Sequence, residues 1–248
     1  MSVRVTFLGS GDAFGSGGRF QTCIAVTAGA TRCLLDCGAS SLIAMRRFGV
    51  DPLSVDAVVI SHLHGDHFGG LPFLILDAQF GRRTRPLTIA GPVGIERRLG
   101  EAMEVLFPGS SAIERKFNVC FVELEDRRSC GIGPFTVTPY TVVHPSGAPP
   151  LALLVAIEGL VVAYSGDTEW TETLVEAASG ADLFVCEAYF FDKRIKYHLD
   201  YRTLLAARNR LDCRRLMLTH MSADMLVRLG EVEAEWAEDG QTVELSAP

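Results

Sequence analysis

The chain has 248 residues, of which 48% are hydrophobic and 21% charged, so it can bury the core of a globular protein. Its formal net charge of -7 excludes a protein that coats nucleic acid through general positive charge. No apolar run approaches the ~18 residues of a membrane span, and the first residues form no apolar signal segment. We therefore expect a soluble, cytoplasmic protein with no membrane partner.

Short apolar and β-branched runs, divided by Gly, Asp and Pro, predict strands along the chain. The predicted strands are 3–8, 22–26, 32–36, 56–61, 87–91, 135–143, 151–157, 160–165, 182–186 and 215–220. Helices are expected between them, at 39–48, 69–80, 93–107, 170–178 and 201–210. Glu158 and Gly159 separate two apolar runs and predict a hairpin. The alternation indicates mixed sheets covered by helices, and without a low-complexity linker we expect a single domain over residues 1–248.

Seven cysteines occur without a CxxC pair or a zinc-ribbon spacing. Most of them lie in apolar runs such as RCLLDCG and DLFVCEA, where a free cysteine behaves as a small buried apolar residue. We therefore expect reduced thiols rather than disulfides or thiolate metal ligands.

Polar side chains follow five of the predicted strands at the point where each strand ends. They are His62, His144, Asp167, Glu187 and His220. Functional sites commonly form at the carboxyl ends of buried strands, so side chains far apart in the sequence are expected to converge here.

The segment HLHGDH holds three of the six histidines of the chain. His62 and His64 are two residues apart and share one face of an extended strand end. Gly65 permits a sharp turn, so that Asp66 and His67 point elsewhere at the start of the next helix. One loop can thus serve two adjacent metal positions.

Two neighbouring metal ions need roughly six to eight ligands, and this loop supplies only four. His144 and His220 offer two further neutral nitrogens, and Asp167 offers a carboxylate that can bridge the ions. The number of ligands is then sufficient without any cysteine.

The motifs SHLHGDHFGGLP, VVHPSG, YSGDT and LTHMS, in this order, resemble those of the metallo-β-lactamase superfamily and, within it, the ribonuclease Z-like hydrolases. VTFLGSGDAF and LLDCGAS extend the resemblance to about residues 3–222. It implies an α/β fold, a four-layer αββα sandwich of two mixed β-sheets flanked by helices. It also implies two divalent metal ions as cofactors, with zinc favoured and manganese or iron as alternatives.

The resemblance assigns ligands position by position. One metal would be held by His62, His64 and His144, and the other by Asp66, His67 and His220. Asp167 would bridge the two ions, and a water between them would be the nucleophile, which Asp66 could orient. Asp36 would either support the first loop by accepting a hydrogen bond or simply cap the turn before Gly38.

The sixth histidine, His198, follows Glu187 in a block that resembles one found in ribonuclease Z-like enzymes. The resemblance implies that His198 lies beside the metals, where it could bind a phosphoryl oxygen or protonate a leaving alkoxide, with Glu187 orienting it. Lys193, Arg194 and Lys196 come just before it, among aromatic residues. They are either substrate-binding residues for a phosphate or part of an ordinary solvated loop.

Three functions remain open at this point. The first is a phosphodiesterase acting on a small or short phosphodiester, which could be cyclic. The second is hydrolysis of a lactone, thioester or sulfate ester, and the third is a non-catalytic accessory role on the same fold. The chain lacks the Gly/Pro-rich arm of full ribonuclease Z enzymes and has Ala39 where they carry Glu, which argues against tRNA 3′-end processing. The resemblance also implies a possible homodimer.

Overall fold

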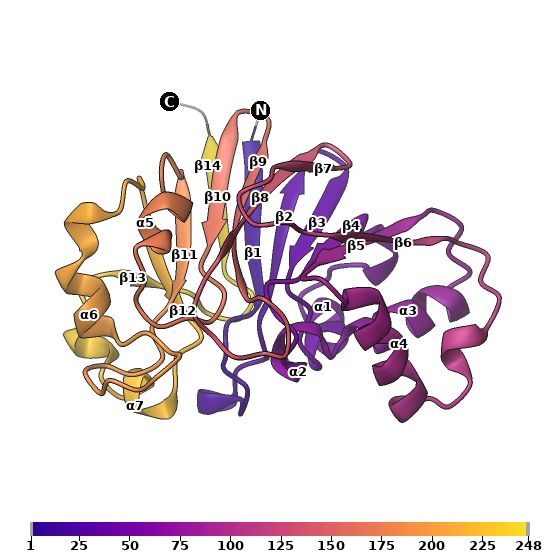
Figure 1. The fold of residues 1–248 in the computed structure, drawn as a ribbon, viewed down its shortest axis with the longest axis horizontal. Helices are drawn as coiled ribbons and strands as arrows, with labels where there is room; N and C mark the ends of the chain where they lie inside the picture. Colours follow the sequence, from indigo (N-terminus) through magenta and orange to yellow (C-terminus); the bar gives the residue numbers. More distant parts are fainter. Residues whose placement is uncertain (1, 247–248) are drawn as a thin grey trace.

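The computed structural model describes residues 2–246. Within them, fourteen strands form two sheets of seven, which stand face to face (Figure 1). The first sheet has the order β14 (Thr242–Ser246), β1 (Ser2–Gly9), β2 (Cys23–Ala28), β3 (Thr31–Leu35), β4 (Ala57–Val59), β5 (Leu87–Gly91) and β6 (Val119–Glu123). The second has the order β13 (Glu235–Trp236), β12 (Leu216–Thr219), β11 (Leu183–Glu187), β10 (Leu160–Tyr164), β9 (Leu151–Ile157), β8 (Phe135–Thr141) and β7 (Cys130–Ile132).

Both sheets are mixed. From β3 to β6 and from β10 to β13 the strands are parallel, and the remaining pairs are antiparallel. All ten strands expected from the sequence are present, and β9 and β10 form the expected hairpin with Glu158 and Gly159 at φ 53° and 77°. Left-handed backbone at both positions is typical of a type I′ two-residue hairpin turn.

Helices cover the outer face of each sheet. On the first sheet lie α1 (Ser41–Arg47), α2 (Gly65–Phe68), α3 (Leu71–Phe80) and α4 (Ile95–Leu106). On the second lie α5 (Thr173–Ala177), α6 (Tyr201–Ala206) and α7 (Ala223–Leu226). The order helix, sheet, sheet, helix confirms the four-layer sandwich. The five expected helices are present, and all five are shorter than expected.

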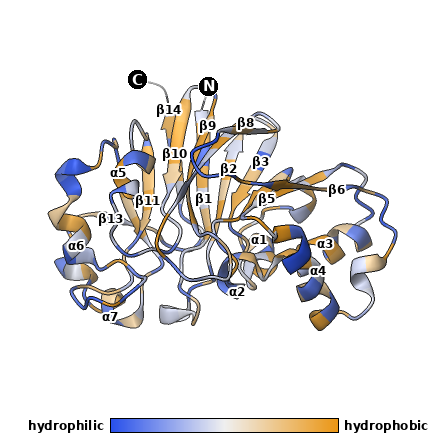
Figure 2. Ribbon diagram, in the orientation of Figure 1, coloured by the Kyte–Doolittle hydropathy of each residue, from blue (hydrophilic) through white to orange (hydrophobic). Residues whose placement is uncertain are grey.

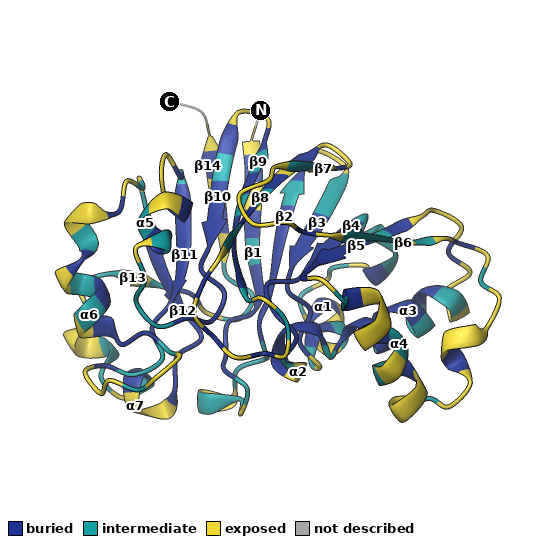
Figure 3. Ribbon diagram, viewed as in Figure 1, coloured by how far each residue is buried: buried dark blue, intermediate teal, exposed yellow. Residues whose placement is uncertain are grey.

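Apolar side chains fill three layers, one between the sheets and one under each set of helices. Figure 2 shows the strands as the most hydrophobic part of the chain, and Figure 3 shows them buried beneath helices with exposed outer faces. Helix α4 illustrates this pattern, since Ile95, Leu99 and Met103 recur every four residues and are its buried positions. The apolar layer that both sheets share is compatible with one domain, which stays a prediction.

No helix among residues 2–246 is both long and apolar enough to cross a membrane. The seven cysteines lie in this part of the chain and are all unpaired, as expected.

Candidate metal centre

The segment after β4 runs through Ser61 to His64 and enters the short helix α2. His62 and His67 are fully buried and Asp66 is 7% exposed, while His64 is more accessible. Our interpretation of Gly65 was wrong, because its φ is not in the left-handed region and an added Cβ would meet nothing within 4 Å. The change of direction comes from the start of α2, where His64 is extended (φ -83°, ψ 152°) and the next residues are helical.

All six histidines meet at one end of the two sheets. The structure brings together two groups of candidate ligands, His62 with His64 and His144, and Asp66 with His67, Asp167 and His220. A third group contains His144, Asp167 and His198. The ligand atoms of each group lie within 4.8 Å of one another.

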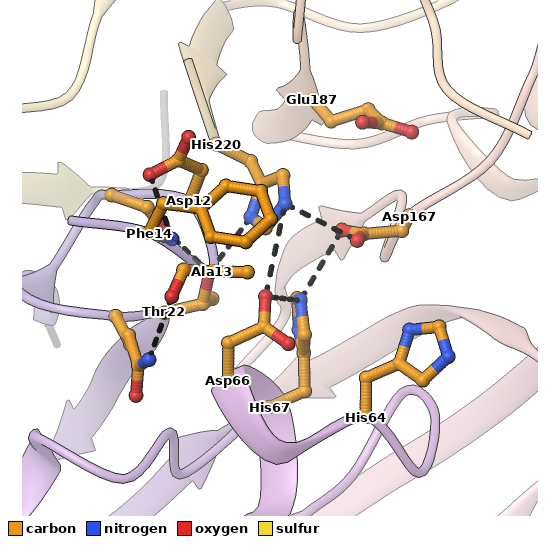
Figure 4. Close-up of polar contacts among 12 residues, drawn as sticks. Asp12, Ala13, Phe14, Thr22, His64, Asp66, His67, Asp167, Glu187 and His220 are labelled. Atoms are coloured by element: carbon orange, nitrogen blue, oxygen red, sulfur yellow. Dashed lines mark hydrogen bonds and ion pairs between the residues drawn. The ribbon is translucent and has the colours of Figure 1, made fainter. Parts of the chain in front are cut away.

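The Asp167 carboxylate faces His67 and His220 in Figure 4, and it also approaches His62 and His144 of the other group. Its carboxylate oxygens are 3.4 Å from His67 Nε2, 3.2 Å from His220 Nε2 and 3.8 Å from His62 Nε2. It therefore stands where a bridging ligand is needed.

Within residues 2–246, three buried polar atoms of this cluster have no hydrogen-bond partner, namely His62 Nε2, His67 Nε2 and Asp167 Oδ1. Buried polar atoms are rarely left unsatisfied in native proteins, and imidazole nitrogens with carboxylate oxygens are suitable donors for divalent transition metals. The residues therefore fit a dinuclear metal centre.

Four histidines are oriented through their other ring nitrogen. Nδ1 of His67 lies 2.7 Å from Asp36 Oδ2, that of His144 lies 2.8 Å from the Tyr197 carbonyl, and that of His62 lies 3.0 Å from Ser61 Oγ. For His220 the neighbour is Thr22 Oγ1 at 3.3 Å. Each contact leaves Nε2 facing the cluster, the usual arrangement around metal-binding histidines.

Asp36 does more than cap the turn before Gly38. Its buried carboxylate accepts from Ser61 N and Ser61 Oγ, both at 2.7 Å, and from Tyr164 Oη at 2.9 Å, besides its contact with His67. Sequence reasoning missed Tyr164 and the Tyr197 carbonyl. A tyrosine in an otherwise apolar strand needs a partner for its hydroxyl, so the sequence could have indicated a role for Tyr164. A backbone carbonyl leaves no trace in the sequence, because every residue has one.

The acidic side chains control the charge of the cluster. Burial would raise the pKa of Asp167, but His220 and His67 outweigh it and hold that pKa well below its usual range. Burial, followed by repulsion from His67, lowers the pKa of His62 well below its usual range. Burial would lower the pKa values of His67 and His220, but Asp167 outweighs it and raises both. Because metal binds an ionised carboxylate and a neutral imidazole, these two rings must lose a proton when metal binds.

His198 lies beside this cluster on the segment that precedes α6. Its Nδ1 is 2.9 Å from Glu187 Oε2 and 4.0 Å from Asp167 Oδ2, and its ring stacks on Tyr189 at 4.6 Å. Burial lowers the pKa of His198, but the hydrogen bond to Glu187 outweighs it and raises that pKa to about 9. Burial raises the pKa of Glu187, which is fully enclosed and also accepts from Thr168 N.

Lys193, Arg194 and Lys196 are exposed on the loop that leads to His198. The ammonium of Lys193 lies 4.8 Å from the centre of the Phe190 ring. Among the described residues, no hydrogen bond or ion pair joins these three side chains to the ligand cluster, so their role in substrate binding stays a prediction.

The family model described as Anti-Pycsar protein Apyc1 matches residues 3–241. The chain belongs to this family. Among curated relatives, ribonuclease Z of Agathobacter rectalis is 26% identical over 260 residues, covering 84% of each chain. Ribonuclease Z of Methanothermobacter thermautotrophicus is 30% identical over 266 residues, covering 89% of this chain and 87% of the relative.

Solved structures share the whole fold. The metallo-β-lactamase fold protein YhfI from Bacillus subtilis superposes with a TM-score of 0.79 at 21% identity, covering 98% of this chain and 99% of its own. The short form of human tRNase Z gives a TM-score of 0.79 at 24% identity, covering 97% of this chain and 98% of its own. Together the comparisons confirm a metal-dependent hydrolase of the metallo-β-lactamase superfamily, ribonuclease Z-like. They do not support our argument against tRNA processing, because relatives named ribonuclease Z match most of the chain.

Proposed function

We propose that this hydrolase is a dinuclear metal-dependent phosphodiesterase that acts on a small or short phosphodiester, either open-chain or cyclic. The position of His198 is the main support, because it places a proton donor beside the candidate ligand cluster. The names of the curated relatives also favour phosphodiester chemistry over lactone, thioester or sulfate ester hydrolysis.

One ion would be held by His62, His64 and His144, the other by Asp66, His67 and His220, with Asp167 shared between them. Zinc is favoured for this set of donors, and manganese or iron would also fit. When bound, two such ions supply an activated water and polarise a phosphoryl oxygen. Asp66 keeps 7% of its surface accessible, and its carboxylate would orient the attacking water.

His198 would act on the leaving group. Its Nδ1 is engaged by Glu187, which leaves Nε2 as the atom that can donate. As the phosphorus–oxygen bond breaks, the proton on Nε2 passes to the departing oxygen, and the bond electrons stay on that oxygen. The buried Glu187 carboxylate stabilises the protonated ring before the transfer and fixes its orientation.

Lys193, Arg194 and Lys196 would bind the part of the substrate beyond the reacting phosphate. Their exposure leaves all three available to a ligand. Replacing all three by alanine should raise KM while leaving kcat close to wild type. The reason is that these side chains would bind the substrate equally well in the ground state and in the transition state. An unchanged KM for every substrate would remove these residues from the substrate site.

Metal analysis coupled to a substrate panel tests the function. The purified protein is expected to hold two ions per chain and to hydrolyse bis(p-nitrophenyl) phosphate or cyclic nucleotides, and to lose this activity on treatment with a chelator. The panel should include precursor tRNA as a second candidate substrate, because the curated relatives are named ribonuclease Z. Robust cleavage of a lactone or thioester without turnover of any phosphodiester would contradict the proposal, and bound metal without any turnover would favour an accessory role.

His198→Ala tests the proton donor. We expect kcat to fall by about 10²–10⁴-fold for an alkoxide leaving group and much less for p-nitrophenolate, which needs no proton. Because His198 also belongs to a candidate ligand group with His144 and Asp167, the metal content of the variant must be measured. Two retained ions agree with a donor, whereas loss of one ion would identify His198 as a ligand instead.

A further inference from the structure

Tyr197 adopts a backbone conformation that tyrosine rarely takes. Its φ is 71°, in the left-handed region, where a side chain with a Cβ is strained. Ile195 and His198 pair across this residue as an isolated antiparallel bridge, so Tyr197 lies inside a tight turn. Something in the surroundings must hold the turn in this strained form.

The turn is connected to two histidines of the candidate metal centre, His144 and His198. The Tyr197 carbonyl accepts from Nδ1 of His144 at 2.8 Å, which turns Nε2 of that ring toward the ligand cluster. The next residue, His198, places its own Nδ1 2.9 Å from Glu187. One peptide turn thus positions both a candidate metal ligand and the candidate proton donor.

The side chain of Glu169 contacts the backbone of the turn. Its carboxylate accepts from the Tyr197 N–H at 2.9 Å. Glu169 lies two residues after Asp167, and its own segment is fixed to the end of β8: Glu169 N donates to the Val143 carbonyl at 3.3 Å, and Val143 N donates to Thr168 Oγ1 at 3.0 Å. The segments that carry Asp167, His144 and His198 are therefore joined to one another through Glu169.

We propose that Glu169 is a positioning residue of this centre: by accepting the Tyr197 N–H, it holds the left-handed turn that aims the Tyr197 carbonyl at His144 and sets His198 on Glu187. Glu169 touches none of the candidate metal ligands through its carboxylate in the described structure, so it acts through the turn. The part of the inference that concerns His198 rests on the proposed phosphodiesterase function, while the part that concerns His144 does not.

Glu169→Ala is the primary test. Without the carboxylate the turn should relax toward extended backbone, and both His144 and His198 lose their orientation. We expect metal retained after dialysis against a competing chelator to fall, with affinity for one of the two ions weakened about 10–100-fold. Phosphodiesterase activity should fall more for alkoxide than for p-nitrophenolate leaving groups, since His198 serves only the former.

Two further variants separate positioning from other roles. Glu169→Gln keeps an oxygen that can accept the Tyr197 N–H, so it should retain wild-type metal affinity and leaving-group dependence. Asparagine populates the left-handed region more readily than tyrosine. Tyr197→Asn introduced into the Glu169→Ala background should therefore restore much of the lost metal affinity and phosphodiesterase activity. Glu172→Ala is the matched control, because Glu172 is exposed and its carboxylate pairs with Arg210, away from the turn.

Three results would overturn the proposal. The first is wild-type metal retention in Glu169→Ala, and the second is an equal loss of metal affinity in Glu169→Gln. The third is metal affinity that Tyr197→Asn fails to restore in the Glu169→Ala background. Metal retention is measured without any substrate. If no phosphodiester is hydrolysed by the wild-type protein, the proposed function fails while the metal readout still decides the role of Glu169.

Discussion

Tyr164 joins the two sheets beside the metal centre. It ends β10 in the second sheet, and its hydroxyl donates to Asp36, which follows β3 in the first sheet. Burial, followed by the charge of Asp36, raises the pKa of Tyr164 well above its usual range, so the hydroxyl remains a donor. Because Asp36 in turn contacts His67 Nδ1, this hydrogen bond lies one step from a candidate ligand.

Tyr164→Phe should reduce the free energy of unfolding of the metal-free protein by about 1.5–3 kcal/mol, the usual range for a hydrogen bond to a charged group. Urea unfolding followed by circular dichroism measures this loss. Tyr140→Phe is the matched control, because Tyr140 is only partly buried, and the ring that packs near Arg127 is kept. A loss no greater than that of the control would show that Asp36 is fully satisfied without the hydroxyl.

Four of the seven candidate ligands could be predicted from the sequence because each of them lies just after an apolar strand. His62, His144, Asp167 and His220 needed only the rule that strand ends converge, and the structure brings them together as expected. Their supports could not be predicted in this way. The Tyr164–Asp36 bond spans 128 positions, and the bond from Tyr197 to His144 uses a backbone atom that every residue possesses.

At the scale of elements, two glycines allow the loop after β3 to lie against the segment around α2. A Cβ on Gly38 would lie 2.3 Å from the Asp66 carbonyl oxygen, and one on Gly70 would lie 2.3 Å from the Gly38 carbonyl oxygen. Backbone bonds connect the same segments, from Cys37 N to the His67 carbonyl at 2.6 Å and from Gly70 N to the Cys37 carbonyl at 2.8 Å. The position of α2, and of the ligands on it, depends on this close approach.

Gly70→Ala should therefore lower the free energy of unfolding by about 1–3 kcal/mol, since backbone atoms must move to accept the methyl group. It should also weaken metal binding, because the shift is transmitted to His67. Gly65→Ala, in the same motif, should be neutral or stabilising by roughly 0.5 kcal/mol, because its Cβ would meet open space and alanine favours a helix. Denaturant unfolding of both variants checks this, and equal destabilisation would contradict it.

The strands that sequence reasoning missed lie at or near the edges of the sheets. β7 and β13 are short and largely accessible, and they lack the apolar run by which the buried strands were recognised. β6, with the sequence VCFVE, does contain such a run, which sequence reasoning overlooked. β14 alternates exposed and buried residues, a pattern compatible with a half-buried strand, and it pairs with β1 from the other end of the chain. Edge strands of this kind depend on a partner strand that local sequence does not specify.

At the scale of the whole molecule, the candidate ligands come from both sheets. His62, His64, Asp66 and His67 follow β4 of the first sheet, whereas His144, Asp167 and His220 follow strands of the second. Helix α2, which carries Asp66 and His67, lies at the end of the sheets opposite the start of β1 and the end of β14 (Figure 1). Metal bound there would hold the two halves of the sandwich together, and unfolding would have to release it.

Metal removal should therefore lower the thermal midpoint. With free metal at about 100 times Kd the folded state gains about 2.7 kcal/mol per site, which for a chain of this size corresponds to roughly 5–10 °C. Differential scanning calorimetry with and without chelator measures the shift, which should grow with the logarithm of metal concentration. His62→Ala removes a ligand from the first sheet and Asp167→Asn alters one from the second, so both should reduce the shift strongly. A shift of wild-type size in either variant would show that the stabilising ion does not bridge the sheets.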